Sequence, residues 1–219
     1  MGITIIDALF IFCVSSASLY VFRKLAYSIG LVDKPNNRKK HNGAIPLVGG
    51  VSICFTIIHY LYLNPFFLEN NTLFIFSIGV LTLIGALDDK FDVSFKLRLV
   101  VQAIISLIMI HQSGIMLSSL GDILLFGEIN LGVLAIPVTV LAVVGVINAF
   151  NMVDGIDGLL GGLSLVTFGA FAYLMVWSNQ ENKLYICILF MITMIPFILM
   201  NLGFVGKQRK VFMGDAGSM

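Results

Sequence analysis

The sequence predicts an all-α fold, a polytopic bundle of membrane-spanning helices that forms one domain over residues 1–219. Three observations predict this fold class. The composition is 58% hydrophobic and only 11% charged, whereas a soluble domain carries about 25% charged residues. The apolar stretches are near the length of about 20 residues that crosses the core of a lipid bilayer. They also follow one another too closely for a separate soluble domain to lie between them.

About seven membrane helices are expected from the apolar stretches. These stretches cover residues 3–22, 47–63, 73–87, 97–116, 131–147, 159–177 and 184–205. The first lacks the basic start of a signal peptide and is followed directly by Arg23 and Lys24, which is typical of a retained membrane helix. The third is short and the fourth contains Arg98 and Gln102, so the ends of these two are less sharply marked. The sixth begins directly after a glycine-rich polar stretch.

Lys and Arg residues predict the orientation of these helices. If the N-terminus lies outside, the loops 23–46, 88–96, 148–158 and 206–219 face the cytoplasm. These loops and the adjoining helix ends then carry 12 of the 13 Lys and Arg residues, which leaves only Lys183 outside. Membrane proteins carry such an excess on the cytoplasmic side. The sequence therefore predicts a multi-pass protein with its N-terminus out, and the net charge of +1 gives no indication of a nucleic-acid partner.

Acidic residues gather on the predicted inner side. Acidic residues have little influence on topology, so membrane insertion does not explain this gathering and a functional role is expected. The members on the inner side are Asp33, Asp88, Asp89, Asp92, Asp154, Asp157 and Asp215.

The first acidic group is Asp88 and Asp89 in GALDDKFD, at the C-terminal end of the third apolar segment. Free carbonyl groups give that end of a helix a partial negative charge, so two carboxylates there need a compensating positive charge. Lys90 alone could supply it. The alternative is a divalent cation or a basic group of a substrate, since Mg²⁺ binds carboxylates together with substrate phosphates.

The second acidic group lies in NAFNMVDGIDGLLGG, residues 148–162. Each glycine that follows an aspartate permits a tight turn and a close approach to a ligand. The N–H groups at the start of the next helix favour an anion such as phosphate. The alternative is a simple turn in which Asp157 caps that helix. The candidate catalytic and binding residues of this stretch are Asn148, Asn151, Asp154, Gly155, Asp157 and Gly158.

The third acidic site is Asp215 in VFMGDAGSM. Together the three sites bring acids from three inner loops to one side of the membrane. Carboxylates that converge on one divalent ion form a phosphoryl-transfer site, in which the metal shields the phosphate charge.

The basic loop LVDKPNNRKKHNGAIPLVGG, residues 31–50, is the fourth element. It either serves only as the topological anchor or recognises phosphate groups of a lipid or nucleotide. In addition, Pro46 and the pair Gly49–Gly50 predict a chain that bends back into the membrane with little regular structure. The phosphate-binding candidates are Arg38, Lys39, Lys40 and His41.

Four motifs, IPLVGG, GALDDKFD, NAFNMVDGIDGLLGG and VFMGDAGS, occur in this order. In this order they resemble the polyprenyl-phosphate N-acetylhexosamine-1-phosphate transferases, and the resemblance runs along essentially the whole chain. IPLVGG and NAFNMVDG are similar to the bacterial members that act on undecaprenyl phosphate. The resemblance implies that UDP-GlcNAc and undecaprenyl phosphate give GlcNAc-diphospho-undecaprenol and UMP. This reaction begins the synthesis of enterobacterial common antigen and of O-antigen lipopolysaccharide.

The resemblance also implies a place, a cofactor and residue roles. It implies an active site on the cytoplasmic face of the bacterial inner membrane, with Mg²⁺ or Mn²⁺ as the cofactor. Asp88 and Asp89 match the pair that activates the lipid phosphate or supports the metal, while Asp215 matches a metal ligand. The catalytic residues implied are Asp88, Asp89, Asn151, Asp154 and Asp157, and the metal ligands are Asp154 and Asp215.

Members of that family continue beyond the last motif with further helices and a histidine-rich loop, whereas this chain ends at Met219. We therefore expect an incomplete domain in which Asp215 lies on a free, solvated tail, and no detectable transferase activity from these 219 residues. An inactive fragment is one alternative. An ion-coupled transporter is another, although it would place acids at mid-membrane depth on broken helices. The sequence does not determine whether the protein forms a homodimer or whether the donor is a related UDP-hexosamine. It also does not distinguish direct attack by the lipid phosphate from a mechanism with a covalent aspartyl intermediate.

Overall fold

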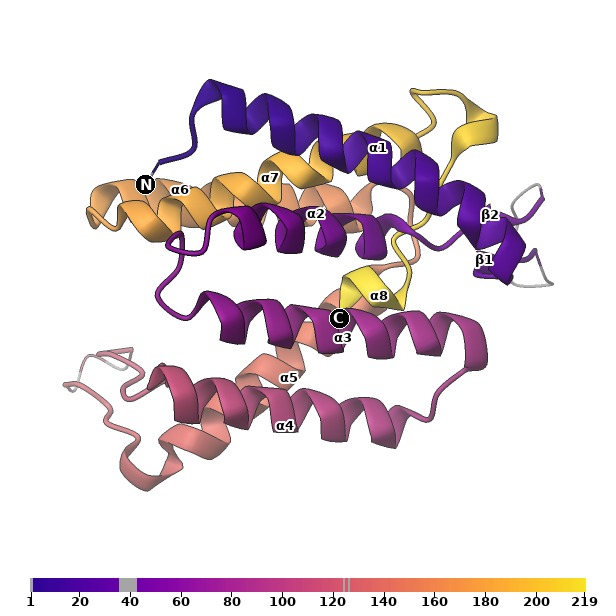
Figure 1. Cartoon of the computed structure of the whole chain (residues 1–219). Coiled ribbons are helices and arrows are strands. Elements are labelled where there is room, and N and C mark those ends of the chain that lie inside the picture. Colours follow the sequence, from indigo (N-terminus) through magenta and orange to yellow (C-terminus); the bar gives the residue numbers. More distant parts are fainter. Residues whose placement is uncertain (1, 36–42, 124, 126) are drawn as a thin grey trace.

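A computed structural model describes residues 2–35, 43–123, 125 and 127–219 (Figure 1). The described chain is predominantly helical, which confirms the all-α fold class. Two-residue strands β1 (Val32–Asp33) and β2 (Ile45–Pro46) form an antiparallel pair, and the short 3₁₀ turns are η1 (Gly132–Leu134) and η2 (Lys207–Arg209). The α-helices are α1 (Ile5–Ile29), α2 (Gly49–Leu63), α3 (Asn71–Phe91), α4 (Phe95–Ser113), α5 (Ala135–Val153), α6 (Leu159–Trp177), α7 (Glu181–Asn201) and α8 (Asp215–Ser218).

Among the described residues, six helices are long and apolar enough to cross a membrane. They are α1, α3, α4, α5 with its preceding turn, α6 and α7. The second predicted segment forms α2, which has 15 residues. At 1.5 Å per residue such a helix is about 22 Å long, short of the bilayer core of about 30 Å. The multi-pass architecture is therefore confirmed, and the second predicted segment forms the shortest of the seven apolar helices in the described part of the chain.

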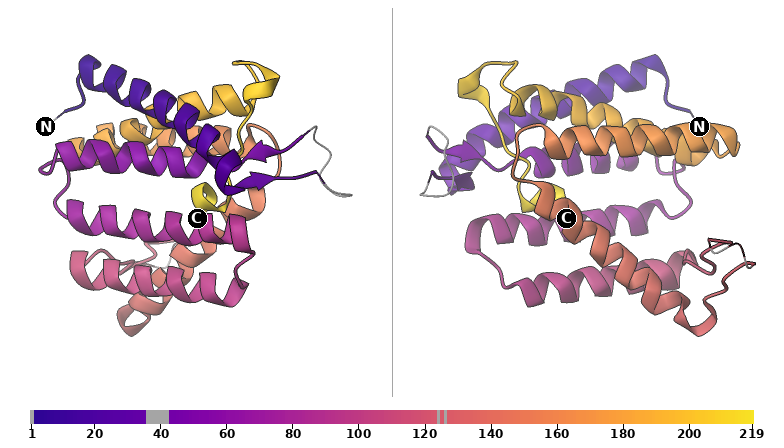
Figure 2. Two further views of the ribbon diagram at one scale, coloured as in Figure 1. Left: turned by 45° about the vertical axis from the view of Figure 1, so that its right-hand side comes forward. Right: turned by 180° about the vertical axis from the view of Figure 1, so that it is seen from behind.

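The connections predicted to face the cytoplasm gather at one end of the bundle. In Figure 1 the β1–β2 pair, the turn between α3 and α4 and the segment after α7 lie toward the right-hand end. Seen from behind, the connection between α5 and α6 lies at the same end of the molecule (Figure 2). The antiparallel order of the helices therefore agrees with the order that the predicted topology requires.

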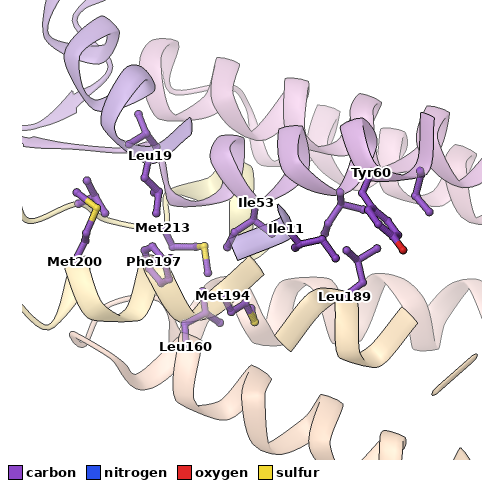
Figure 3. Packing of buried hydrophobic residues seen from close by; sticks show 14 of the residues in the cluster. Ile11, Leu19, Ile53, Tyr60, Leu160, Leu189, Met194, Phe197, Met200 and Met213 are labelled. Atoms are coloured by element: carbon purple, nitrogen blue, oxygen red, sulfur yellow. The ribbon is translucent and has the colours of Figure 1, made fainter. Parts of the chain in front are cut away.

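The buried core lies between α1, α2, α6 and α7 (Figure 3). Its largest buried side chains include Leu19 of α1, Leu61 of α2 and Leu189 of α7. Met213, which comes from the segment before α8, lies in the same cluster. By contrast, α4 and α5 carry many exposed apolar side chains, as expected of helices that face lipid.

The C-terminal segment is packed, so the expectation of a free, solvated tail is wrong. Val211 is 0% and Met213 1% exposed, because both apolar side chains insert into the core. The short helix α8 that follows lies against α3 and α2 and also contacts α5. Asp215 begins this helix and is therefore held by three neighbouring elements.

Backbone hydrogen bonds join the start of α2 to the segment before α8. The N–H groups of Val48 and Gly49 donate to the carbonyl of Phe212, and that of Gly50 donates to the carbonyl of Met213. The first N–H groups of a helix have no partner within it, so this segment satisfies the start of α2.

The chain near Gly49 is regular, so the expectation that it bends back into the membrane with little regular structure is wrong. Pro46 lies in β2, and its carbonyl accepts the N–H of Phe212 at 2.9 Å. Gly49 and Gly50 are the first two residues of α2.

Candidate active site

Three of the four motifs meet at α8 through glycines. A Cβ atom at Gly50, in IPLVGG, would overlap the backbone of Gly217. One at Gly85, in GALDDKFD, would overlap the backbone of Asp215. Because neither obstacle is a side chain that could rotate away, only glycine permits this approach. The glycines of these motifs therefore allow α2 and α3 to close on the helix that carries Asp215.

The Asp215 carboxylate receives hydrogen bonds from two other elements. Asn151 donates through Nδ2 to Oδ1 of Asp215, and the same amide contacts the Ser218 Oγ at 2.9 Å. The Arg98 Nη1 lies 3.4 Å from Oδ2 of Asp215. Helix α5 continues to Val153, so Asn151 lies on a helix, whereas we expected it in a loop.

Arg98 connects two of the predicted acids. Its Nη1 forms an ion pair with Oδ2 of Asp88, which is 7% exposed, as well as the longer contact with Asp215. Lys90 instead lies over the ring of Phe91, with Nζ 5.0 Å from the centroid. The charge that compensates Asp88 therefore comes from α4, and the suggestion that Lys90 supplies it is wrong.

Arg98 was expected only as a topological charge, and its place in the site was not predicted from the sequence. A signal was available, because a charged residue inside an apolar segment of a membrane protein usually has a functional partner.

Asp89 faces α8. Its Oδ1 accepts the N–H of Asp215 at 2.9 Å, and its Oδ2 accepts the N–H of Ala216 at 3.2 Å. Asp88 and Asp89 are thus adjacent in sequence but bind different partners, Arg98 and the backbone of α8.

Asn148 makes a contact between helices. Its Nδ2 donates to Oε1 of Gln102 at 2.8 Å and to the carbonyl of Val144 at 2.7 Å. Gln102 is 2% exposed, so this contact satisfies a buried amide of α4. Asn148 lies within α5 and not in the expected loop.

The turn between α5 and α6 carries the remaining predicted residues. Asp154 follows the last residue of α5, and the N–H of Gly155 donates to the carbonyl of Val153 at 2.8 Å. Asp157 forms an ion pair with Lys210, a contact that includes neither Asp88 nor Asp215.

Gly158 is the N-cap of α6, with a φ of 74° and no side-chain cap. The alternative in which Asp157 caps this helix is therefore wrong. The N–H of Gly158 donates to Oδ1 of Asn201 at 2.7 Å, so this N–H group binds a protein oxygen.

The phosphate-binding candidates of the basic loop, which are Arg38, Lys39, Lys40 and His41, lie outside the described residues. Across the part of the chain that is described, no group of three or more His, Cys, Asp or Glu residues is arranged to hold a metal ion.

These features define a polytopic helical membrane protein in which four ordered motifs converge near one end of the bundle, with Asp88, Asp215, Asn151 and Arg98 in one polar centre. The chain belongs to Glycosyl transferase family 4, whose sequence model matches residues 71–219.

Several similar proteins, all with the same name, support the assignment of this chain to the family. A protein of Yersinia pestis is 49% identical over 212 residues, which are 97% of this chain and 58% of the relative. One of Escherichia coli (strain K12) is 44% identical over the same shares of the two chains. One of Haemophilus influenzae is 48% identical over 92% of this chain and 57% of its own length. Each is named undecaprenyl-phosphate alpha-N-acetylglucosaminyl 1-phosphate transferase. The chain spans less than two thirds of these relatives, and the resemblance noted from its motifs is confirmed.

Proposed function

We propose that the protein transfers GlcNAc-1-phosphate from UDP-GlcNAc to undecaprenyl phosphate and releases UMP, at the cytoplasmic face of a bacterial inner membrane. The observation that carries the proposal is the convergence of Asp88, Arg98, Asn151 and Asp215 on one centre. The names of relatives that share 44 to 49% of their aligned residues with this chain support the substrates.

The chemistry of this transfer matches a charged centre near the membrane surface. An oxygen of the lipid phosphate forms a bond to the sugar-bearing phosphorus, and the anhydride bond to UMP breaks, with UMP taking the electron pair. The same anhydride bond breaks whether attack is direct or passes through an aspartyl intermediate. Both substrates are anions, so positive charge has to stabilise the transition state. Arg98 supplies one fixed positive charge, and Asn151 supplies an amide donor.

We infer Mg²⁺ as the cofactor, with Mn²⁺ as a substitute. Mg²⁺ is commonly held by one or two carboxylates together with substrate phosphates, so two protein ligands suffice. Asp215 and Asp154 would hold it, and the side chain of Asp215 is partly exposed, at 32%. When bound, the ion would shield phosphate charge and orient the leaving group. Turnover that is undiminished in excess EDTA would contradict this inference.

A transporter is less well supported by the same geometry. Helices α3 and α5 run unbroken to Asp88 and Asn151, whereas a transporter places its acids on interrupted helices at mid-membrane depth.

The test uses membranes that contain the protein, with UDP-GlcNAc labelled in the sugar and with or without undecaprenyl phosphate. The expectation of inactivity rested on a free tail, whereas Asp215 lies on a helix packed against α2, α3 and α5. We therefore expect activity, with UMP and lipid-linked sugar formed in equal amounts and both dependent on the added lipid. UDP as the product would indicate transfer of the sugar without its phosphate and would contradict the proposal. Asp215→Asn is the negative control, and UDP-GalNAc in place of UDP-GlcNAc tests the choice of donor.

A further inference from the structure

We propose that Asp89 is a positioning residue, whose carboxylate caps α8 and thereby places Asp215, while the adjacent Asp88 faces Arg98. This assignment rests on the proposed function only in that the reaction uses Asp215. It separates two neighbouring aspartates that the resemblance treats as one catalytic pair.

Both oxygens of Asp89 bind the start of α8. Oδ1 accepts the N–H of Asp215 and Oδ2 accepts the N–H of Ala216, at 2.9 and 3.2 Å. The two donors are the first two residues of that helix. A carboxylate that accepts successive N–H groups at a helix start acts as an N-cap, and here the cap comes from a residue 126 positions away in sequence.

Helix α8 needs a cap from outside because it cannot supply its own. It has four residues, and the first N–H groups of any helix have no acceptor within it. The residue at its N-cap position is Gly214, which has no side chain that could accept these groups.

Gly214 also provides the space for the external cap. Its φ is 74°, a conformation that glycine adopts without strain. A Cβ atom at this position would lie 2.5 Å from Oδ2 of Asp89. Gly214 and Asp89 are therefore in direct contact, and the glycine leaves the space that the Asp89 carboxylate occupies.

The geometry of α3 explains why the two aspartates differ. Successive residues of an α-helix point about 100° apart, so the carboxylates of Asp88 and Asp89 lie toward different groups, the Arg98 guanidinium and the backbone N–H groups of α8. Gly85, four residues before Asp89, lies on the same face, and it is the glycine that touches the backbone of Asp215. One face of α3 therefore binds α8, and the next face presents Asp88 to Arg98.

Comparison of two substitutions tests the assignment. Asn is as good an N-cap acceptor as Asp, whereas Ala accepts nothing. We expect Asp89→Asn to keep kcat within roughly tenfold of the native value, because one oxygen still accepts an N–H group of α8. We expect Asp89→Ala to lower kcat by about 100-fold or more, because misplacement of Asp215 by about 1 Å is sufficient for such a loss.

A second measurement does not depend on activity. Hydrogen exchange of the purified 219-residue chain in detergent, followed by mass spectrometry, reports on the peptide that contains Asp215 and Ala216. We expect faster exchange there in Asp89→Ala and near-native exchange in Asp89→Asn. Asp88→Asn is the matched control and leaves this exchange unchanged. Gly214→Ala should speed the same exchange with Asp89 intact, which keeps the test decisive if Asp89→Ala does not fold.

The outcomes separate the two proposals. If Asp89→Asn is as inactive as Asp89→Ala while exchange at α8 is native in both, Asp89 acts through its charge and the positioning role is wrong. If the native protein releases no UMP but the exchange pattern is as expected, the proposed function fails and the positioning role stands.

Discussion

Arg98 is the residue that holds two carboxylates of the site in one place. Asp88 and Asp215 come from α3 and α8, and like charges repel unless a positive group lies between them. The guanidinium of Arg98 contacts both. Its planar fork of donors suits this sharing, whereas a lysine has a single charged nitrogen. The polar centre therefore depends on a basic residue that no motif contains.

Substitution of Arg98 tests that dependence. Arg98→Ala leaves the Asp88 carboxylate buried without its cation, so we expect a loss of about 3 kcal/mol in the free energy of unfolding. Unfolding in mixed detergent micelles measures it. Lys96→Ala removes an exposed positive charge near the same helix end and should change stability little. Addition of Asp88→Asn to Arg98→Ala should recover part of the loss, and a loss that is unaffected by this second change would contradict the ion pair.

The acids of the centre should differ in their importance for turnover. We expect Asp215→Asn and Asp154→Asn each to lower kcat by roughly two orders of magnitude, because charge next to the reacting phosphate lowers the barrier. Asp157→Asn should have a much smaller effect, since the Asp157 side chain is 46% exposed and pairs with Lys210. Steady-state kinetics on protein of unchanged stability compares the three. A near-native kcat for Asp215→Asn would refute its role.

At the scale of the elements, close contact of backbones determines how the site assembles. Helix α2 begins where the segment before α8 supplies acceptors for its N–H groups, and α8 packs on α2 and α3. Glycines at these contacts leave no room for a side chain. Helix α2 is a shorter apolar helix of 15 residues, and its first residues contribute to the joint with α8.

Two glycine substitutions test this joint. In Gly50→Ala the new Cβ would overlap the backbone at Gly217, so we expect α8 to shift and kcat to fall by about 100-fold or more. Gly162→Ala is the matched control, because Gly162 lies inside α6 with nothing within 4 Å of its would-be Cβ. It should be neutral or stabilise the protein by about 0.5–1 kcal/mol. Equal activity of the two variants would show that α2 and α8 do not need close contact.

At the scale of the whole molecule, the two ends of the bundle differ in charge and in chemistry. Asp88 lies in the last turn of α3, Arg98 in the first turn of α4 and Asn151 near the end of α5. The turn between α3 and α4 lies at the same end of the bundle as the β1–β2 pair (Figure 1). If the basic residues face the cytoplasm, this end is exposed to the nucleotide sugar.

Cysteine labelling tests the orientation. With Cys13, Cys54 and Cys187 replaced, we expect Ser94→Cys, in the turn between α3 and α4, to react with an impermeant maleimide only from the cytoplasmic side. Asn70→Cys, just before α3, should react only from outside. Both positions are exposed, so accessibility does not limit the comparison. The reverse pattern would place the polar centre on the outer face and contradict the proposed access to UDP-GlcNAc.

The helices, their order and the acids of the centre were predictable from the amino-acid sequence. Apolar stretches of bilayer length are a local property of the sequence, so they can be recognised without knowledge of the contacts between helices. Asp88 and Asp215 were recognised because their clustering near helix ends has no explanation in membrane insertion. The second stretch, predicted over residues 47–63, likewise forms an apolar helix, α2, over Gly49–Leu63.

Which polar groups contact one another was not predictable without the three-dimensional fold. Arg98 and Asp215 are separated by 117 positions in sequence, and Asp89 and Asp215 by 126. Such contacts depend on the rotation of each helix about its axis and on how closely backbones approach, which composition and spacing do not specify. For this reason Asn148 proved to bind Gln102, Asp157 to bind Lys210, and the expected free tail to be a helix packed in the bundle.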